Sequence, residues 1–327
     1  MKKVLLLSCF VLGGATLASA SYELALIYDV TNRQILRYDP VSNRALGSFG
    51  AGNLGYYGNA NVLALDPSAK GSVLALDITG VLRRFDYSTG IRLGALQLAT
   101  GGTNQFGRSI KVLSNGNYLV TSDVDASSKV FDRNTGALLT TFQSFSGYTS
   151  LDCVQLSDGS FASLERTAIG SNFDFHLFRR DTSGTFSSWT PNIMTGVPNG
   201  TLSTLNTEAN LVTALGINVF PRFRQFSFTA AGYTAIAQSS HLWGGNSVTS
   251  LVSGHAGQGY FIQNINAAAG KLYVMDNVSR HVADIAVTPY TQTMGSMVMV
   301  VAPEPASLTA LALGSVVLLR RRRRAKL

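Results

Sequence analysis

Cysteine is scarce in this sequence, which contains only Cys9 and Cys153. Small secreted domains that depend on disulfides carry several cysteine pairs, so a disulfide framework is excluded. Cys153 lies in the alternating segment from Leu151 to Leu156, which is typical of a strand. A free cysteine there is usually a small buried hydrophobic side chain. We expect no catalytic role for Cys153, because no histidine accompanies it in a recognisable motif.

Charged residues are also few, at 13% of the chain, although the formal net charge is +8. The excess of positive charge sits at the two ends, at Lys2, Lys3, Lys326 and the arginines from Arg320 to Arg324. Without the ends, and without Glu304, the body carries 18 basic and 17 acidic residues, a net charge of about +1. A nucleic-acid partner is therefore not expected.

Most motifs that mark catalysis or metal binding are missing. The chain has no glycine-rich phosphate loop ending in lysine, no Gly-x-Ser-x-Gly turn, and no repeated carboxylate pair typical of a glycosidase. The four histidines, His176, His241, His255 and His281, form no zinc motif. We interpret His176 and His281 as packing or surface side chains. We assign no catalytic residue, no metal ligand and no cofactor.

One short acidic segment resembles the start of a calcium loop. Asp123-Val124-Asp125 offers two carboxylates at the right spacing. The third oxygen ligand, the glycine and the closing glutamate of such a loop do not follow. A calcium site is therefore the less favoured interpretation of these two aspartates.

The N-terminus has the layout of a secretory signal peptide over residues 1–20. Lys2 and Lys3 precede an apolar run from Val4 to Leu17, and Ala18-Ser19-Ala20 forms a small-residue cleavage site before Ser21. This predicts passage through the Sec translocon and cleavage by signal peptidase between Ala20 and Ser21. Cys9 would leave with the peptide, and no intramolecular disulfide would then be possible. The alternatives are a retained membrane helix, for which the run is short, and lipoprotein processing at Cys9.

The C-terminus, residues 301–327, contains three elements in a fixed order. They are Pro303-Glu304-Pro305, an apolar segment from Ala306 to Leu319 predicted as a short transmembrane helix, and the cluster Arg320, Arg321, Arg322, Arg323 and Arg324. Fourteen helical residues reach about 21 Å, which is short for a hydrocarbon core of about 30 Å. Clustered arginines stay on the cytoplasmic side, so the body would lie outside the cytoplasmic membrane.

This tail resembles the PEP-CTERM sorting signal of exported bacterial proteins, over about the last 25 residues. The resemblance implies recognition by an exosortase, a membrane-embedded transpeptidase, and removal of the tail at or near Pro-Glu-Pro. It further implies transient residence in the cytoplasmic membrane and then delivery to the cell surface or extracellular matrix. The alternative is a single-pass C-terminal anchor, and a retained tail would fit a membrane-held sensor.

The body repeats with a period near 47 residues. A strand-like segment ends in a turn at Asp39, Asp86, Asp132 and more weakly Asp181, with spacings of 47, 46 and 49. Each aspartate can accept hydrogen bonds from the following backbone amides, and a nearby Gly or Asn can adopt a left-handed conformation. We interpret these aspartates as turn formers.

A second pattern of paired short strands precedes these turns. It comprises Val62–Leu65 with Ser72–Asp77, Ile110–Leu113 with Gly116–Asp123, Cys153–Leu156 with Gly159–Leu164, and Ile262–Ile265 with Gly270–Asp276. Two strands plus the hairpin give four strands per repeat, which is the plan of a β-propeller blade. The segment from Tyr22 to Tyr28 matches a second strand, so Met294 to Val301 is predicted to complete the first blade. This predicts an all-β fold over residues 21–300, with about six blades and seven as the alternative.

The blade plan resembles bacterial surface propellers related to the NHL and quinoprotein-like groups. The most unusual stretch of the body is Gln238 to Gly259, rich in Gly and Ser and outside a clear blade pattern. Long loops carry function more often than the scaffold does, so His241, Trp243 and His255 are the candidate ligand-binding residues. Asn53 to Tyr57 is a second candidate. A flexible connection between blades is the alternative interpretation of both.

Two functional hypotheses follow from these features. The first is a non-enzymatic surface or matrix protein whose propeller binds an exopolysaccharide or a surface protein. The second is an exported polysaccharide hydrolase or lyase with its site at the central channel. The sequence leaves enzymatic activity uncertain, because a fold alone does not define a function.

Overall fold

The structure is a computed structural model. It describes the backbone of residues 21–303, apart from gaps at 41, 43, 55–61, 68, 78, 100–108, 123, 171, 189–191, 199–200, 209–210, 218–221, 230–231, 239–247, 254–258, 267–268, 276–280 and 287–293. Side chains are described for residues 24–187 and 296–300, with the same gaps and without Val62. Residues Glu23 to Val300 form one compact unit, and the predicted signal peptide and the C-terminal segment beyond Pro303 lie outside the described residues.

The described chain is built of β-strands. They are β1 (Ser21–Asp29), β2 (Gln34–Asp39), β3 (Arg44–Phe49), β4 (Val62–Leu65), β5 (Ser72–Leu76), β6 (Val81–Asp86), β7 (Arg92–Gln97), β8 (Ser109–Val112), β9 (Tyr118–Ser122), β10 (Ser127–Phe131), β11 (Leu138–Gln143), β12 (Thr149–Gln155), β13 (Phe161–Ile169), β14 (Asn172–Arg180), β15 (Phe186–Ser188), β16 (Asn192–Pro198), β17 (Thr201–Glu208), β18 (Leu211–Ile217), β19 (Arg222–Thr229), β20 (Gly232–Gln238), β21 (Val248–Ser253), β22 (Gly259–Asn266), β23 (Ala269–Met275), β24 (His281–Ala286) and β25 (Met294–Pro303). No helix in the described part of the chain is long and apolar enough to cross a membrane.

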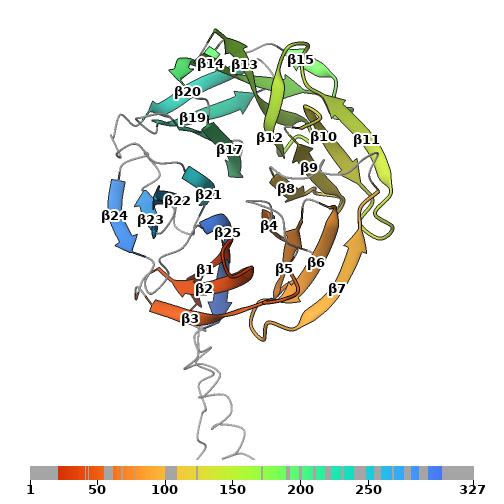
Figure 1. The fold of residues 1–327 in the computed structure, drawn as a ribbon. Helices are drawn as coiled ribbons and strands as arrows, with labels where there is room; N and C mark the ends of the chain where they lie inside the picture. Colours follow the sequence, from red (N-terminus) through yellow and green to blue (C-terminus); the bar gives the residue numbers. More distant parts are fainter. Residues whose placement is uncertain are drawn as a thin grey trace, which may run out of the picture. The chain divides into compact units, whose positions relative to one another are not determined.

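These strands form antiparallel sheets of the propeller type (Figure 1). Four sheets are described down to their side chains in most of their strands, and we call them the first to fourth blades. They have the strand orders β25-β1-β2-β3, β4-β5-β6-β7, β8-β9-β10-β11 and β12-β13-β14-β15. Two further sheets, β17-β18-β19-β20 and β21-β22-β23-β24, are described by their backbone alone. The prediction of an all-β propeller is confirmed.

The predicted closure of the first blade is also confirmed. Strand β25, from the end of the body, pairs beside β1, so β1 is the second strand of its sheet. The backbone N–H of Leu63 in the second blade donates to Ser296 Oγ of β25 at 3.0 Å. Strand β25 is therefore hydrogen-bonded both to β1 of its own sheet and to Leu63 of the second blade. Joining the two ends in one sheet leaves no open edge at that seam.

The turn predictions at the aspartates are confirmed by the hydrogen bonds. Asp86 Oδ1 accepts from the N–H groups of Ser88 and Thr89, and Asp132 Oδ1 accepts from those of Asn134 and Thr135. Asp39 and Asp181 bond in the same way to the residues that follow them. The turns of the second, third and fourth blades end at Gly90, Gly136 and Gly184, all with positive φ. The repeated turn is thus fixed by local chemistry.

Two strand assignments from the sequence were wrong. The pair at Ile262–Ile265 and Gly270–Asp276 falls in β22 and β23, the second and third strands of their sheet, whereas the other three pairs are first and second strands. Alternation has the same period in every strand, so it cannot identify a strand's place in a sheet. The stretch from Gln238 to Gly259, expected to lie outside the blade pattern, contains strand β21.

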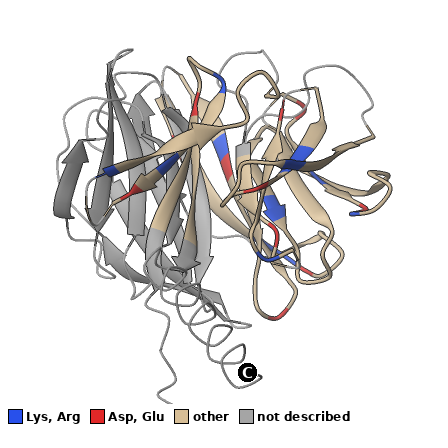
Figure 2. Ribbon diagram, turned by 90° about the horizontal axis from the view of Figure 1, so that it is seen from below, with Lys and Arg blue, Asp and Glu red and all other residues tan. Residues whose placement is uncertain are grey.

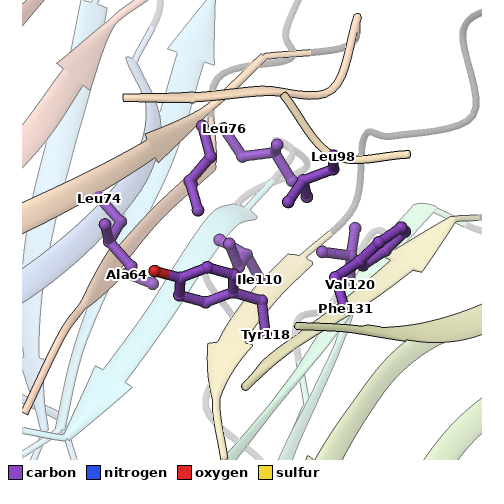
Figure 3. Packing of buried hydrophobic residues seen from close by; sticks show 9 residues of the cluster. Ala64, Leu74, Leu76, Leu98, Ile110, Tyr118, Val120 and Phe131 are labelled. Carbon is purple, nitrogen blue, oxygen red and sulfur yellow. The ribbon is translucent and has the colours of Figure 1, made fainter. Parts of the chain in front are cut away.

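The core between the second and third blades is apolar. Tyr118 and Phe131 of the third blade pack with Leu74 and Leu76 of the second, and Figure 3 shows the cluster around the ring of Tyr118. The remaining members are Ala64, Leu82, Leu98, Ile110 and Val120. Charged residues of both signs are interspersed over the described strands and turns in Figure 2. Packing of side chains between neighbouring sheets, rather than any cross-link, holds these blades together.

Candidate functional site on the fourth blade

The ligand-binding residues proposed from the sequence, His241, Trp243 and His255, lie outside the described residues. So do Ala18, Ala20, Glu304, Pro305 and the arginines 320–324. Ser21 begins β1 and Pro303 ends β25, and their side chains are not described. In the second candidate segment, Asn53 is exposed and Leu54 is buried, and residues 55–57 are not described. Whether these candidates lie near one another is therefore outside what the described residues show.

A different candidate arises where the fourth blade departs from the repeat. The residue before each turn aspartate is Tyr38, Phe85 or Phe131 in the first three blades, and all three rings are fully buried. In the fourth blade this position is Arg180, whose side chain is 3% exposed. A buried charge is costly unless a partner and further hydrogen bonds compensate it. A guanidinium at this buried position therefore requires a charged partner and hydrogen-bond acceptors that an aromatic ring does not need.

That environment is supplied mainly by Glu165 of β13, which is fully buried. Arg180 Nη2 donates to Glu165 Oε1 at 2.6 Å, and Arg180 Nε donates to Ser163 Oγ at 3.1 Å. Arg180 Nη1 donates to the carbonyl of Gly184 at 3.0 Å, and Nη2 also donates to the carbonyl of Gln143 at 2.8 Å. The ring of Phe186 lies over the guanidinium at 3.9 Å. The charge is therefore paired, hydrogen-bonded and stacked.

The ion pair also holds the loop that enters the fourth blade, residues 144–148. The N–H of Phe145 donates to Glu165 Oε2 at 2.9 Å, and Thr167 Oγ1 donates to the carbonyl of Gly147 at 3.1 Å. Because Arg180 holds the carbonyl of Gln143, both partners of the ion pair anchor backbone at the start of this loop. The loop is thus held by Arg180, which stands where the other blades have an aromatic ring, and by its partner Glu165.

The side chains of this loop join a cluster of aromatic rings. Phe145 stacks on Phe178 with 14° between the ring planes and meets Tyr148 and Phe186 edge to face. Phe145 is nevertheless 41% exposed. A partly exposed ring that is packed against other rings and tethered by its own backbone presents a fixed apolar surface.

The hairpin of β13 and β14 is longer than its counterparts. Each strand has nine residues, against five or six in the second and third strands of the second and third blades. The extension is supported by β16, which pairs with β14 at Phe173↔Val197 and Phe175↔Met194. On it lie the packed pair Arg166–Phe173 and the exposed Ile169. We call the surface formed by Phe145, Gly147, Tyr148 and Thr167 the fourth-blade platform.

Titratable groups lie beneath this platform. His176 is buried and stacks on Phe178, and its Nε2 is 3.5 Å from Tyr148 Oη. Burial, with the carboxylates of Asp174 and Glu165 nearby, raises the pKa of Tyr148. Tyr148 therefore stays protonated at neutral pH. His176 is thus buried and stacked, the position expected of a packing side chain.

Cys153 is buried between the third and fourth blades, among Leu119, Phe142 and Phe161. Burial raises the pKa of its thiol to about 12, so the reactive thiolate is absent at neutral pH. Beside it, Asp152 is fully buried and accepts from Ser109 Oγ at 2.5 Å, and Lys111 Nζ lies 3.8 Å away.

The structure does not favour calcium at Asp125. Its carboxylate accepts from Ser127 Oγ at 2.8 Å and forms an ion pair with Lys129, while Asp123 lies outside the described residues. Asp29, which ends β1, and Asp77, which follows β5, both accept backbone N–H groups of the next turn. In the part of the chain that the structure describes, no three His, Cys, Asp or Glu side chains form a metal-binding group.

Sequence reasoning did not identify the Glu165–Arg180 pair or the platform. The available signal was the fourth turn segment, Phe178-Arg179-Arg180-Asp181, in which arginine stands where the other copies have an aromatic residue. Its partner Glu165 is 15 residues away on the neighbouring strand, and no periodicity connects the two. Only the register, in which Phe161 faces Arg180 and Glu165 faces His176, places them on one side of the sheet.

Comparisons with known proteins agree on the fold. No family model matches the chain, and no curated protein matches it in sequence. Among solved structures, a chain of the nidogen/laminin complex has a TM-score of 0.58 at 12% identity, covering 85% of this chain and 98% of that one. A protein of unknown function from Bacteroides caccae has a TM-score of 0.56 at 11% identity, covering 86% and 99%.

The β-propeller domain of Cps50 (Swd1) from Myceliophteria thermophila gives a TM-score of 0.54 at 10% identity, covering 81% of this chain and 83% of that one. At such low identity a similarity of structure reflects the fold alone, because one fold carries many unrelated functions. The chain is thus similar to β-propellers of diverse origin.

Proposed function

We propose that this chain is an exported, non-enzymatic surface or matrix protein whose propeller is a rigid scaffold for binding polysaccharide. The observation that carries the proposal is the fourth-blade platform, where Phe145 is exposed yet fixed by Phe178 and by Glu165. A ring of this kind offers an apolar face on which the C–H face of a sugar ring stacks. The exposed hydroxyl of Thr167, which donates to the carbonyl of Gly147, is a hydrogen-bonding group of the same platform.

The nature of the described polar groups supports binding rather than catalysis. Glu165 is fully buried and accepts from Arg180, Ser163 and the N–H of Phe145, so its carboxylate is not presented to a substrate at the surface. The body is nearly neutral, which favours a neutral polysaccharide over a strongly acidic one.

Affinity electrophoresis of the mature protein through gels that contain a neutral glucan tests this proposal. We expect retardation of the native protein and loss of that retardation in Phe145→Ala. The matched control is Leu93→Ala, which removes a comparably exposed side chain from β7. Equal retardation of native protein and Phe145→Ala, or mobility unchanged by the glucan, would refute the platform as the binding site.

The proposed export rests on the two ends of the sequence. Lys2, Lys3 and Ala18-Ser19-Ala20 fit a signal peptide, and Pro303-Glu304-Pro305 with the arginine cluster resembles an exosortase signal. Strand β1 begins at Ser21 and β25 ends at Pro303, so both proposed processing sites adjoin the ends of the described strands. Processing there would leave these strands whole.

Intact mass of the protein recovered from the surface of its host tests the export proposal. We expect a form that begins at Ser21 and ends near Pro303. A variant in which the five arginines 320–324 are replaced by serine should keep its tail and stay with the cytoplasmic membrane. An intact, membrane-held tail in the native protein would overturn sorting and favour an anchored receptor.

The second candidate function is a polysaccharide lyase or hydrolase, and the contact between Tyr148 and His176 is the observation in its favour. A tyrosine and a histidine together can move a proton during cleavage of a polymer. The test is release of reducing ends by the native protein compared with Tyr148→Phe. Turnover that disappears in Tyr148→Phe, while glucan retardation persists, would establish the enzyme.

We further infer that the ring has six blades rather than seven. Each of the six hydrogen-bonded sheets contains four strands in sequence order, apart from β25, which completes the first sheet, and the additional strand β16. Side-by-side strands β4 and β8, β9 and β12, β12 and β17, and β17 and β21 link successive sheets. Cryo-electron microscopy or crystallography of the mature protein would count the blades directly.

A further inference from the structure

The extended hairpin of the fourth blade carries a carboxylate beside the platform. Asp174 of β14 pairs across the hairpin with Thr167 of β13, and Thr167 belongs to the platform. Residues paired directly across two strands lie on the same face of the sheet, so Asp174 shares the face of Thr167. Strands β13 and β14 pair at nine positions, whereas β5 with β6 and β9 with β10 pair at five. Asp174 therefore belongs to a part of the blade that the repeat does not require.

Strand β16 is irregular at the same position. Between the pairs Phe173↔Val197 and Phe175↔Met194, β16 contains two residues and β14 contains only Asp174. An extra residue of this kind is a β-bulge, which re-aims a neighbouring side chain and is frequent beside functional sites. The pairing of β13 with β14 has no such shift. The departure from regular pairing thus coincides with the carboxylate.

The negative charge of Asp174 acts on the platform. Burial, followed by the charges of Asp174 and Glu165, raises the pKa of Tyr148, a platform residue. Glu165 is committed to Arg180 and to the backbone of the loop, whereas Asp174 lies beside Thr167. A ligand on the platform therefore meets the field of a carboxylate.

An aromatic ring and a carboxylate together favour a ligand that carries an ammonium group. The face of a ring attracts a cation, and a carboxylate accepts charge-assisted hydrogen bonds from it. The ring of Phe145, which is 41% exposed, also offers an apolar surface to the C–H face of a sugar. A sugar with a free, protonated amino group matches both features.

We propose that the platform prefers a polysaccharide with free amino groups, whose ammonium lies at Asp174 while the sugar ring stacks on Phe145. This inference rests on the proposed function and narrows its ligand to a polymer with scattered positive charge. The nearly neutral body adds little repulsion to such a polymer.

Isothermal titration calorimetry of the mature protein with a hexamer of glucosamine and a hexamer of N-acetylglucosamine tests this preference. At about pH 6 the aspartate is ionised and the free amino groups are protonated. We expect the glucosamine hexamer to bind at least about tenfold more tightly. Asp174→Asn should remove this preference and leave the affinity for the N-acetylglucosamine hexamer unchanged. The matched control is Asp158→Asn, which removes a half-exposed carboxylate from the same blade and should keep the preference.

The outcomes separate this inference from the proposed function. Equal affinity of the native protein for both hexamers, or a preference that survives in Asp174→Asn, would overturn the amino-sugar inference and leave polysaccharide binding standing. Binding of neither hexamer would overturn the inference, and the proposed function as well if the neutral glucan fails to retard the protein. The comparison on the native protein involves no substitution, so it is decisive even if Asp174→Asn does not fold.

Discussion

The third and fourth blades place different side chains at the same point of the repeat. In the third blade Phe131, before Asp132, is fully buried in an apolar cluster with Leu76 and Tyr118. In the fourth blade Arg180, before Asp181, is buried against Glu165 and Ser163. In both blades the turn aspartate accepts the backbone N–H two residues later at 2.9 Å. The turn of the fourth blade is one residue shorter, because Gly184 N–H donates to the carbonyl of Asp181, whereas Gly136 N–H donates to that of Asp132.

This difference separates what the repeat requires from what one blade adds. The turn aspartate is needed wherever the chain reverses, and the position before it must fill a buried space. A ring fills that space without further partners, whereas a guanidinium requires a carboxylate and several acceptors. The acceptors present, the carbonyls of Gln143 and Gly184, lie at the end of β11 and in the turn before β15. The fourth blade thus converts a packing position into an anchor for the loop that carries Phe145.

Arg180→Ala should have the largest effect on stability. It leaves Glu165 buried without its charge partner, which costs about 3–5 kcal/mol of the free energy of unfolding. Arg179→Ala breaks the ion pair with Asp158, a carboxylate that is half exposed, and should cost about 1 kcal/mol or less. Urea unfolding followed by circular dichroism measures both. Equal losses of unfolding free energy for the two substitutions would show that the buried pair Arg180–Glu165 contributes no more than the surface pair Arg179–Asp158.

Gly136→Ala should cause the next largest loss of stability, because Gly136 lies in the turn that follows Asp132. Gly136 has a φ of +71°, and an added Cβ would lie 2.2 Å from the carbonyl oxygen of Gln97 in the second blade. Backbone strain of this kind costs about 1–3 kcal/mol before the clash is added. Gly71→Ala, with φ +86° and open space, is the control for strain alone. If thermal unfolding shows that Gly136→Ala loses no more stability than Gly71→Ala, the backbone around Gln97 moves away from the added Cβ without loss of stability.

Acid should lower the stability of the protein through the turns at Asp86 in the second blade and Asp181 in the fourth. We expect this effect to be smaller than that of either substitution above. Hydrogen bonds from the side chain of Ser88 and the N–H of Thr89 lower the pKa of Asp86, and those from Ser183 and Thr185 lower the pKa of Asp181. A carboxylate with a lowered pKa in the folded state contributes stability that is complete above its unfolded pKa of about 3.9 and is lost as the pH falls through the folded pKa. The urea midpoint should therefore fall between pH 5 and pH 3, and Asp86→Asn should reduce that dependence. A midpoint that rises on acidification would contradict the assignment.

Cys153 should show the smallest effect, namely no reaction. Its thiol is buried between the third and fourth blades with a pKa raised to about 12. A chromogenic disulfide reagent at pH 8 should therefore label the unfolded protein and leave the folded mature protein unlabelled. Rapid labelling of the folded protein would mean that the seam opens readily.

The repeat and the turns could be predicted from the sequence because their causes are local. Asp132 bonds to residues within three positions of itself, and the 47-residue period makes the same chemistry visible several times. The closing strand β25 could be predicted because the sequence of β1 matches the second strand of a repeat, so the first strand had to come from elsewhere in the chain.

The rest could not be predicted, for two physical reasons. The place of β22 in its sheet depends on pairing between strands, which alternation does not encode. The Glu165–Arg180 pair depends on cross-strand register and on carbonyls of Gln143 and Gly184, which become partners only after folding. The fourth-blade platform is a property of tertiary structure, so the sequence pointed instead to unusual composition at His241, Trp243 and His255.

The double variant Arg180→Met/Glu165→Leu tests most directly whether the ion pair exists to anchor the loop. Apolar residues of similar volume can replace a buried ion pair with little loss of stability. We predict a near-native urea midpoint, faster hydrogen–deuterium exchange over residues 143–148 measured by mass spectrometry, and loss of retardation by the neutral glucan. Exchange and retardation that both match the native protein would show that the ion pair does not hold the loop, and would contradict the account.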